Sequence, residues 1–163
     1  DAILSRRSPE EKQRILKDPH VGAFAVISLG VLFLLCFAFA LSLPEEAELR
    51  ALIFAPAAVR CVSALCVESF RPLRGSQYAE GYDRKKRRAS TGALLFMLLL
   101  SLGAAFFIGG IGAVLPALLA ALACLLSILY ARGQLGGMSG DVAGMGTVLG
   151  EAACLAAMLV TLA

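Results

Sequence analysis

Residues 89–131 read ASTGALLFMLLLSLGAAFFIGGIGAVLPALLAALACLLSILYA, and this stretch contains no charged side chain. One helix crosses the hydrocarbon core of a bilayer, about 30 Å thick, in about 20 residues. The stretch is too long for a single crossing, and Gly109, Gly110 and Gly112 interrupt its middle. It therefore predicts a tight helical hairpin, with membrane spans over residues 91–108 and 111–130.

Three further apolar runs predict three more spans, which makes about five. They are residues 21–43, residues 51–67, which contain Arg60, and residues 141–163, which contain Glu151. With 59% hydrophobic and 17% charged residues, the chain is far more apolar than a soluble domain of its size, and it lacks the low hydrophobicity that disorder requires. The sequence predicts an all-α, polytopic transmembrane helix bundle that forms a single domain over residues 1–163.

Basic residues alternate along the loops between these spans. Lys and Arg are frequent in residues 1–20 and 69–90, nearly absent from residues 44–50, and represented by Arg132 in residues 131–141. Loops rich in Lys and Arg stay on the cytoplasmic side. The pattern predicts a multi-pass protein of the cell inner (plasma) membrane, with these three loops sharing the cytoplasmic face. A net charge of +3 without interleaved aromatic residues argues against nucleic acid.

A short helix is predicted within the first loop. Ser8 suits the N-cap, Pro9 suits the first helical position, and Glu11 stands where a capping box requires it. The helix is expected to lie at the membrane interface and to bring Asp18 to the surface. A simple interfacial anchor is the alternative.

Three carboxylates are expected on this cytoplasmic face: Asp1, Asp18 and Asp141. Carboxylate oxygens suit Mg²⁺, which commonly bridges protein and phosphate. Together with the nearby basic residues, they suit metal-assisted phosphoryl transfer. The five cysteines lie in apolar stretches and are expected to pack as free thiols.

A glycine-rich stretch, GGMSGD over residues 136–141, precedes the last span. The free N–H groups and the dipole at the start of that helix would suit a phosphate. The alternative is a flexible turn with Ser139 or Asp141 as N-cap. Within the spans, Arg60 is a candidate phosphate ligand and Glu151 a candidate partner of Arg60 or of a metal, while a purely structural ion pair is the alternative.

Two segments together resemble cobalamin synthase, the adenosylcobinamide-GDP ribazoletransferase family. The first reads DAILSRRS over residues 1–8 and ILKDPHVGAF over residues 15–24, which is similar to the family's D-G-x-x-S-x-R-S and M-x-D-S-x-x-G-x-x-G. The second reads GGMSGDVAG over residues 136–144, with Glu151 as a trailing acid, and is similar to G-G-x-T-G-D-x-x-G-A. Between them, Pro56 and Arg60 resemble the family's intramembrane P-x-x-x-R.

This chain departs from the family pattern at several positions. Ala2 replaces a glycine, Pro19 replaces a serine, His20 replaces an arginine, and Val148 replaces one trailing acid. Only the second aspartate of the family's D-x-x-D-G is represented, as Asp1. The resemblance therefore predicts a divergent member, or one that lacks the family's N-terminal part.

The resemblance implies that adenosylcobinamide-GDP is joined to α-ribazole, or to its 5′-phosphate, with release of GMP. It implies that Mg²⁺ is held by the catalytic residues Asp1, Asp18 and Asp141. It implies substrate binding by a further set of residues: Arg7, Lys17, Arg60, Gly137, Ser139, Gly140 and Glu151. An oligomer is compatible with this interpretation.

Two other functions fit parts of the sequence. A CDP-alcohol-type membrane phosphotransferase shares the metal chemistry, but it requires a fuller D-x-x-D-G-x-x-A-R and a second aspartate pair four residues apart, which this chain lacks. A transporter or membrane scaffold would account for Arg60 and Glu151, but it leaves the three cytoplasmic aspartates without a purpose.

Overall fold

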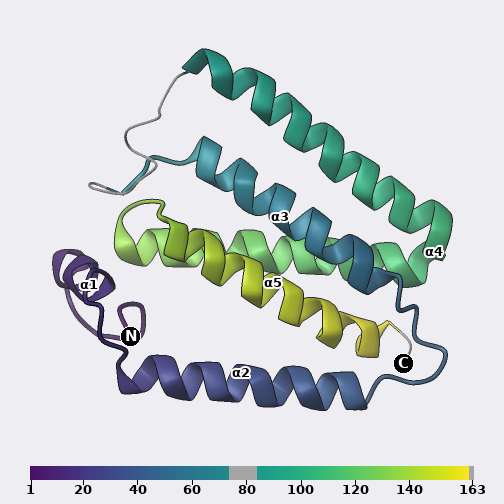
Figure 1. Cartoon of the computed structure of the whole chain (residues 1–163), viewed down its shortest axis with the longest axis horizontal. Helices are drawn as coiled ribbons and strands as arrows, with labels where there is room; N and C mark the ends of the chain where they lie inside the picture. The colour runs from purple at the N-terminus through teal and green to yellow at the C-terminus, as the bar shows by residue number, and fades with distance from the viewer. Residues whose placement is uncertain (74–83, 162–163) are drawn as a thin grey trace.

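A computed structural model describes residues 1–73 and 84–161, with the backbone alone for residues 84–88. The described residues form five helices, and α4 doubles back on itself (Figure 1). The helices are α1 (Pro9–Leu16), α2 (Ala23–Leu41), α3 (Ala51–Ser69), α4 (Arg84–Leu135) and α5 (Gly140–Val160). The predicted basic loop over residues 69–90 is described in part, because residues 74–83 lie outside the described residues.

The predicted hairpin is present inside α4. Gly110 adopts φ 62° and ψ −152°, values outside the helical region, and the two legs of α4 run in opposite directions from this point (Figure 1). A positive φ costs glycine little because it has no Cβ. Four helices are long and apolar enough to cross a membrane, with residues 89–135 counted as one, so the two legs of α4 give the five predicted spans.

Helix α1 begins as the sequence predicts. The Ser8 hydroxyl accepts a hydrogen bond from the backbone N–H of Glu11, and the Glu11 carboxylate accepts one from the backbone N–H of Ser8. This reciprocal capping box satisfies two N–H groups that the first helical turn leaves free. Pro9 occupies the first helical position, where a missing N–H costs nothing.

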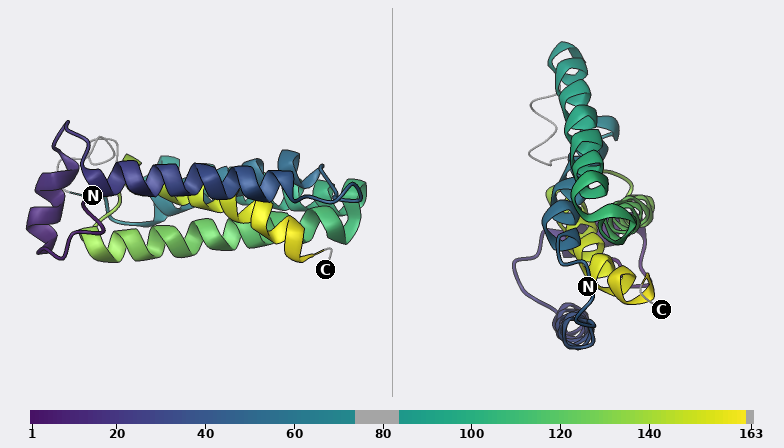
Figure 2. Two further views of the ribbon diagram at one scale, coloured as in Figure 1. Left: turned by 90° about the horizontal axis from the view of Figure 1, so that it is seen from below. Right: turned by 90° about the vertical axis from the view of Figure 1, so that its right-hand side faces the viewer.

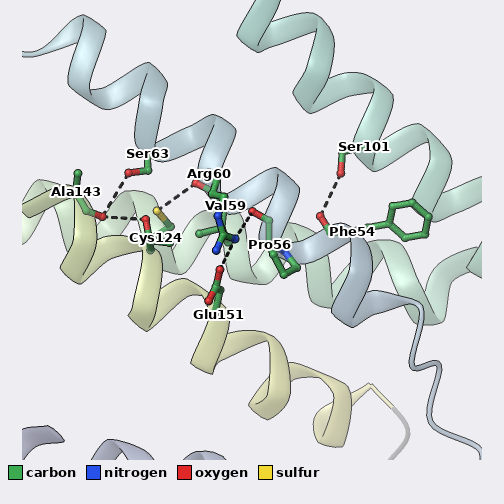
Figure 3. A network of polar contacts seen from close by, with 10 residues as sticks. Phe54, Pro56, Val59, Arg60, Ser63, Ser101, Cys124, Ala143 and Glu151 are labelled. Carbon is green, nitrogen blue, oxygen red and sulfur yellow. Dashed lines mark hydrogen bonds and ion pairs between the residues drawn. The ribbon is translucent and has the colours of Figure 1, made fainter. Parts of the chain in front are cut away.

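Small residues form the core between α3, α4 and α5. Gly146 and Gly150 of α5 let that helix approach α4 closely: a Cβ on Gly150 would lie 2.9 Å from the carbonyl oxygen of Ala120, and one on Gly146 would overlap Ile128. Ser63 of α3 donates to the carbonyl oxygen of Ala143 on α5 over 3.3 Å (Figure 3). Between apolar helices, such close packing and interhelical hydrogen bonding drive association.

Helix α2 differs from the other spans. None of its residues is buried, and in the end-on view of Figure 2 it lies apart from the layer that α3, α4 and α5 form. The free cysteines follow the same division. Cys66, Cys124 and Cys154 are buried in the core, whereas Cys36 of α2 and Cys61 are partly exposed.

The α2–α3 connection closes one end of the bundle against the α4 hairpin. Arg50 donates from its guanidinium to the carbonyl oxygen of Ile108, at the end of the first leg of α4. A Cβ on Gly109 would lie 3.3 Å, and one on Gly112 3.2 Å, from the Glu48 side chain, which pairs with Arg50 over 3.4 Å. These contacts are favoured by the small residues around the kink.

Candidate functional site

Segments that are distant in sequence meet at the opposite end of the bundle. The N-terminal residues, α1, the end of α3 and the turn between α4 and α5 lie together at the left of Figure 1, away from the Gly110 kink. Residues 1–20 and 131–141 therefore share one end, as the charge pattern predicts. This end holds Asp1, Asp18 and Asp141.

Asp1 caps helix α2. Its carboxylate accepts hydrogen bonds from the backbone N–H of Gly22 over 2.7 Å and from that of Ala25 over 3.1 Å. A negative charge is favourable at a helix N-terminus, where N–H groups lack partners. A Cβ on Gly22 would lie 2.5 Å from a carboxylate oxygen of Asp1, so glycine is needed for this contact. The sequence placed Asp1 at this end but did not reveal the capping role.

Asp18 stands just beyond α1 and bonds to His20. Its Oδ1 accepts from the backbone N–H of His20 over 3.0 Å and lies 2.7 Å from the Nδ1 atom of that imidazole. The backbone hydrogen bond from His20, followed by the side-chain one, lowers the pKa of Asp18 below its usual range. Asp18 is therefore ionised and exposed to solvent at neutral pH.

The turn between α4 and α5 uses its two glycines in different ways. Gly136 adopts φ 80° just after α4 and donates its N–H to the carbonyl oxygen of Arg132, which is a common way to end a helix. A Cβ on Gly137 would lie 2.9 Å from the Cα atom of Leu73. The first glycine thus provides a left-handed backbone conformation, and the second allows a close approach between two backbones.

That approach joins the end of α3 to the glycine turn. Leu73 donates its N–H to the carbonyl oxygen of Met138 over 2.7 Å, and Met138 donates to that of Arg71 over 3.0 Å. The Arg132 guanidinium lies 4.2 Å from the ring centroid of Phe70, a cation–π contact across the same junction. Sequence reasoning missed this junction because the two segments are far apart in the chain.

Helix α5 begins with Ser139 as its cap, one of the two N-caps that the sequence left open. The Ser139 hydroxyl accepts from the N–H of Val142, and Ser139 is buried. The N–H groups of Gly140 and Asp141 find no acceptor among the described residues, and both residues are exposed. The start of α5 therefore combines the capped turn and the free donors that the sequence offered as alternatives.

Helix α1 docks on the end of α4 through two polar side chains. Lys12, only 6% exposed, donates from Nζ to Oε1 of Gln134 over 2.5 Å. Gln13 donates to the carbonyl oxygen of Leu135 over 2.8 Å. A cation is favourable near the free carbonyls of a helix C-terminus. These residues fix α1 beside the turn. The spacing of Lys12 and Gln13 along the helix did not predict this docking on α4.

The two basic candidates near α1 are exposed. Arg7 lies 3.6 Å from Glu11 in a solvated pair, and Lys17 is the C-cap residue of α1. Such surface pairs contribute little to stability. Both cations are therefore available to an anionic ligand at this end of the bundle.

Arg60 and Glu151 lie elsewhere, near the middle of α3 and α5. The guanidinium of Arg60 donates to the Glu151 carboxylate over 2.5 Å and to the carbonyl oxygen of Pro56 over 3.1 Å (Figure 3). This is the intramembrane pair that the sequence offered as one alternative. Substrate binding by either residue stays a prediction.

The predicted magnesium ligands do not form a cluster in the described structure. Within residues 1–73 and 84–161, no three His, Cys, Asp or Glu side chains lie close enough together to hold a metal ion. Both carboxylate oxygens of Asp1 already accept backbone hydrogen bonds. Asp1, Asp18 and Asp141 share an end of the bundle but do not form a ready-made ligand set, so a magnesium site stays a prediction.

Comparisons with known proteins agree with the resemblance. The family model described as cobalamin-5-phosphate synthase matches residues 1–159. A protein of Clostridium perfringens (strain 13 / Type A) named adenosylcobinamide-GDP ribazoletransferase is 38% identical over 152 residues, which cover 93% of this chain and 61% of that protein. Proteins of the same name from Clostridium botulinum (strain Alaska E43 / Type E3) and Desulfitobacterium hafniense (strain Y51) are 36% and 33% identical, each over 93% of this chain and 60% of their own length.

The chain thus spans about three fifths of the length of these relatives. No solved structure matches it. The family match covers nearly every described residue, including the capped start of α2, the glycine turn and the mid-span ion pair. This chain belongs to the cobalamin-5-phosphate synthase family.

Proposed function

We propose that this chain takes part in joining adenosylcobinamide-GDP to α-ribazole, with release of GMP. Relatives of the same family carry the name adenosylcobinamide-GDP ribazoletransferase, which supports the proposal. Whether the acceptor is α-ribazole or its 5′-phosphate does not alter the chemistry at phosphorus. The reaction forms the last link of the cobalamin nucleotide loop.

One observation carries the proposal: the α5 N-terminus presents free backbone donors at the end of the bundle that also holds exposed cations. The N–H groups of Gly140 and Asp141 have no acceptor among the described residues. Lys17 lies at the same end of the bundle, beyond α1 (Figure 1). Backbone N–H groups at a helix start and Lys side chains are both suited to phosphate oxygens.

The transfer is a displacement at phosphorus. A ribazole hydroxyl forms a new O–P bond, the bond between the two phosphates breaks, and the hydroxyl proton passes to water as GMP leaves. Such reactions depend on holding the reactants in line and on balancing the charge that spreads over the phosphate oxygens. In this chain, Arg7, Lys17 and the donors around Ser139 would hold phosphates, with Gly137 keeping the turn in shape.

Magnesium belongs to the proposal only as a prediction. Mg²⁺ often binds through one or two carboxylates together with substrate phosphates and water. Asp18 and Asp141 are exposed at this end and would be the candidates, with Asp1 engaged in capping α2. No step above depends on the ion. Transfer activity that survives exhaustive chelation of divalent metal ions would exclude a role for Mg²⁺.

We also propose that the site faces the cytoplasm from the inner membrane. Residues 1–20 and 131–141 lie at the site end, and loops rich in Lys and Arg are retained on the cytoplasmic side. In inside-out vesicles, a maleimide that cannot cross the membrane is expected to label a cysteine introduced as Arg14→Cys and not one introduced as Glu46→Cys. Both positions are exposed, at opposite ends of the bundle. Labelling of both from one side would contradict the proposed topology.

Turnover by the chain in membranes tests the function. With both substrates supplied, GMP and the joined product are expected in equal amounts. Arg7→Ala and Lys17→Ala are expected to reduce the rate at least tenfold while the protein still inserts and folds. Glu46→Gln at the opposite end is the matched control and should retain the full rate. Product formation by both site variants at the wild-type rate would contradict the proposed site.

A further inference from the structure

Arg132 differs from the other arginines whose side chains the structure describes. Those arginines are all exposed. Three of them pair with a glutamate: Arg7 with Glu11, Arg50 with Glu48, and Arg60 with Glu151. Arg132, in the last turn of α4, is partly buried, and its guanidinium forms no hydrogen bond or ion pair with any described residue. A guanidinium carries five N–H donors, and a charged donor withdrawn from water without an acceptor is costly. The Arg132 guanidinium is therefore suited to an anion from outside the chain.

Phe70 holds the Arg132 side chain in place. The guanidinium lies 4.2 Å from the centroid of the Phe70 ring, and Phe70 is the C-cap residue of α3. An aromatic face attracts the cation and restricts its movement, but it offers no oxygen to the N–H groups. Phosphate oxygens often bind a guanidinium through two parallel N–H bonds. The contact with the ring therefore leaves Arg132 able to bind phosphate.

The ring and the guanidinium are both tied to the glycine turn. Arg71, which follows Phe70, accepts a hydrogen bond at its carbonyl oxygen from the N–H of Met138 over 3.0 Å. Met138 stands two residues before Gly140, whose own N–H finds no acceptor among the described residues. At the start of the turn, the carbonyl oxygen of Arg132 accepts a backbone N–H over 2.9 Å. The cation is thus held beside the segment that leads to the free donors of α5.

We propose that the Arg132 guanidinium, held by Phe70, binds a phosphate group of the nucleotide substrate beside the start of α5. The inference rests on the proposed function, because adenosylcobinamide-GDP supplies the phosphates. A guanidinium on these oxygens balances the charge that the departing GMP carries away, and it stays protonated throughout. Phe70 is a positioning residue, which acts through Arg132. The phosphate of a lipid headgroup has the same chemistry and is the competing source, since Arg132 lies at the end of a span.

Chemical modification of Arg132 tests the contact in the wild-type chain. Phenylglyoxal reacts with arginine, and mass spectrometry of the digested chain reports each arginine separately. In a maltoside detergent, which contains no phosphate, adenosylcobinamide-GDP is expected to slow the modification of Arg132 at least tenfold. Arg14 is the matched control, because it is exposed on α1 at the same end of the bundle and its side chain has no described contact (Figure 1). An unchanged rate at Arg132, or equal slowing at Arg14, would overturn the proposal.

A second arm of this experiment separates the two sources of phosphate. The chain is transferred without substrate from the maltoside detergent into vesicles of phosphatidylglycerol. The modification rate at Arg132 is expected to stay within about twofold of its value in detergent, because lipid phosphate does not occupy the guanidinium. Slowing by the lipid alone to the level reached with the substrate would overturn the proposal, since a headgroup would then be the partner of Arg132.

Variants separate a phosphate ligand from a structural cation. Arg132→Gln is expected to weaken the binding of adenosylcobinamide-GDP at least tenfold in equilibrium dialysis. Arg132→Lys should recover part of the loss, because lysine keeps the charge but lacks the planar fork. Phe70→Leu should weaken binding less than Arg132→Gln does, and Phe70→Tyr, which keeps the ring, should bind as the wild type does. Binding by Arg132→Gln at the wild-type level would overturn the proposal.

The design keeps this inference separate from the proposed function and from failure to fold. The protection experiment uses the wild-type chain, so it decides the question even where Arg132→Gln does not assemble. GMP release is not part of any readout. Turnover without protection of Arg132 would contradict this inference alone, whereas protection without turnover would contradict the proposed function alone.

Discussion

Helices α2 and α5 have similar lengths, 19 and 21 residues, and both are apolar enough to cross a membrane. Helix α2 is the most apolar span in the described chain, and yet none of its residues is buried. Helix α5 is the least apolar, and yet it buries six residues, two of them the glycines Gly146 and Gly150. In a bilayer, lipid solvates apolar side chains as well as protein does, so hydropathy marks the span and small residues mark the packed surface.

The largest expected effect comes from filling the packed surface. Gly150→Leu would press against Ala120, Cys124 and Val59, and it is expected to cost about 3 kcal/mol of unfolding free energy or to prevent assembly. The matched change in α2, Gly30→Leu, meets nothing within 4 Å and should cost almost nothing. Thermal unfolding in detergent compares the two. Equal losses of unfolding free energy in the two variants would contradict the difference in packing between α5 and α2.

The ion pair between α3 and α5 gives an intermediate effect. Arg60→Leu or Glu151→Leu alone leaves a single charge at mid-span and should lower the unfolding free energy, whereas the double variant should recover part of the loss. The expected coupling is about 1 kcal/mol, as for other polar contacts between membrane helices. A double-mutant cycle measures it. No coupling, together with weaker binding of adenosylcobinamide-GDP by Arg60→Lys, would assign Arg60 to the substrate instead.

A smaller and local effect is expected where α2 begins. Because none of the residues of α2 is buried, the two hydrogen bonds that the Asp1 carboxylate accepts from Gly22 and Ala25 are a main attachment of its first turn. Gly22→Ala would push the Asp1 carboxylate away and should cost about 1 kcal/mol of local stability, comparable to losing an N-cap. Amide exchange should quicken in the first turn of α2 and stay unchanged in α5. Faster exchange in both helices would show that α2 is not independent of the core.

The smallest effect concerns Asp18 and has a defined pH dependence. Its pKa is lowered in the folded protein, first by the backbone N–H of His20. The ionised carboxylate therefore stabilises the fold above the ordinary aspartate pKa, and this stabilisation is lost as pH falls through the lowered value. Asp18→Asn should be slightly less stable than wild type at neutral pH, and the two should converge in acid. A difference that widens in acid would contradict the assigned contact.

Local features of the fold were predictable from the sequence, whereas contacts between distant segments were not. The Ser8 and Glu11 capping box and the Gly110 kink follow from short motifs and were confirmed. The serine cap of α5 was one of the alternatives that the sequence left open. The docking of Lys12 on α4 joins residues that no local pattern connects, so it was missed. The spans were placed within a few residues of the observed helices, because hydropathy reports the bilayer thickness directly.

Prediction of the candidate site from the sequence was limited in the same way. The alternation of basic loops predicted that Asp18 and Asp141 lie at one end of the bundle, because the Lys and Arg content of a loop decides on which side of the membrane it stays. The use of Asp1 as a cap and the approach of Leu73 to Gly137 depend on tertiary geometry. The pairing of Arg60 with Glu151 was one of two alternatives that sequence alone left open, because helix rotation decides which side chains meet.

Substrate protection tests most directly whether the glycine turn, and not the opposite end, binds the nucleotide. In a chain without its native cysteines, Gly140→Cys keeps the backbone donor, and Glu46→Cys reports the far end. Adenosylcobinamide-GDP is expected to slow alkylation at position 140 at least tenfold and to leave position 46 unchanged. Equal rates with and without substrate at position 140, or protection at position 46 alone, would contradict the proposed site.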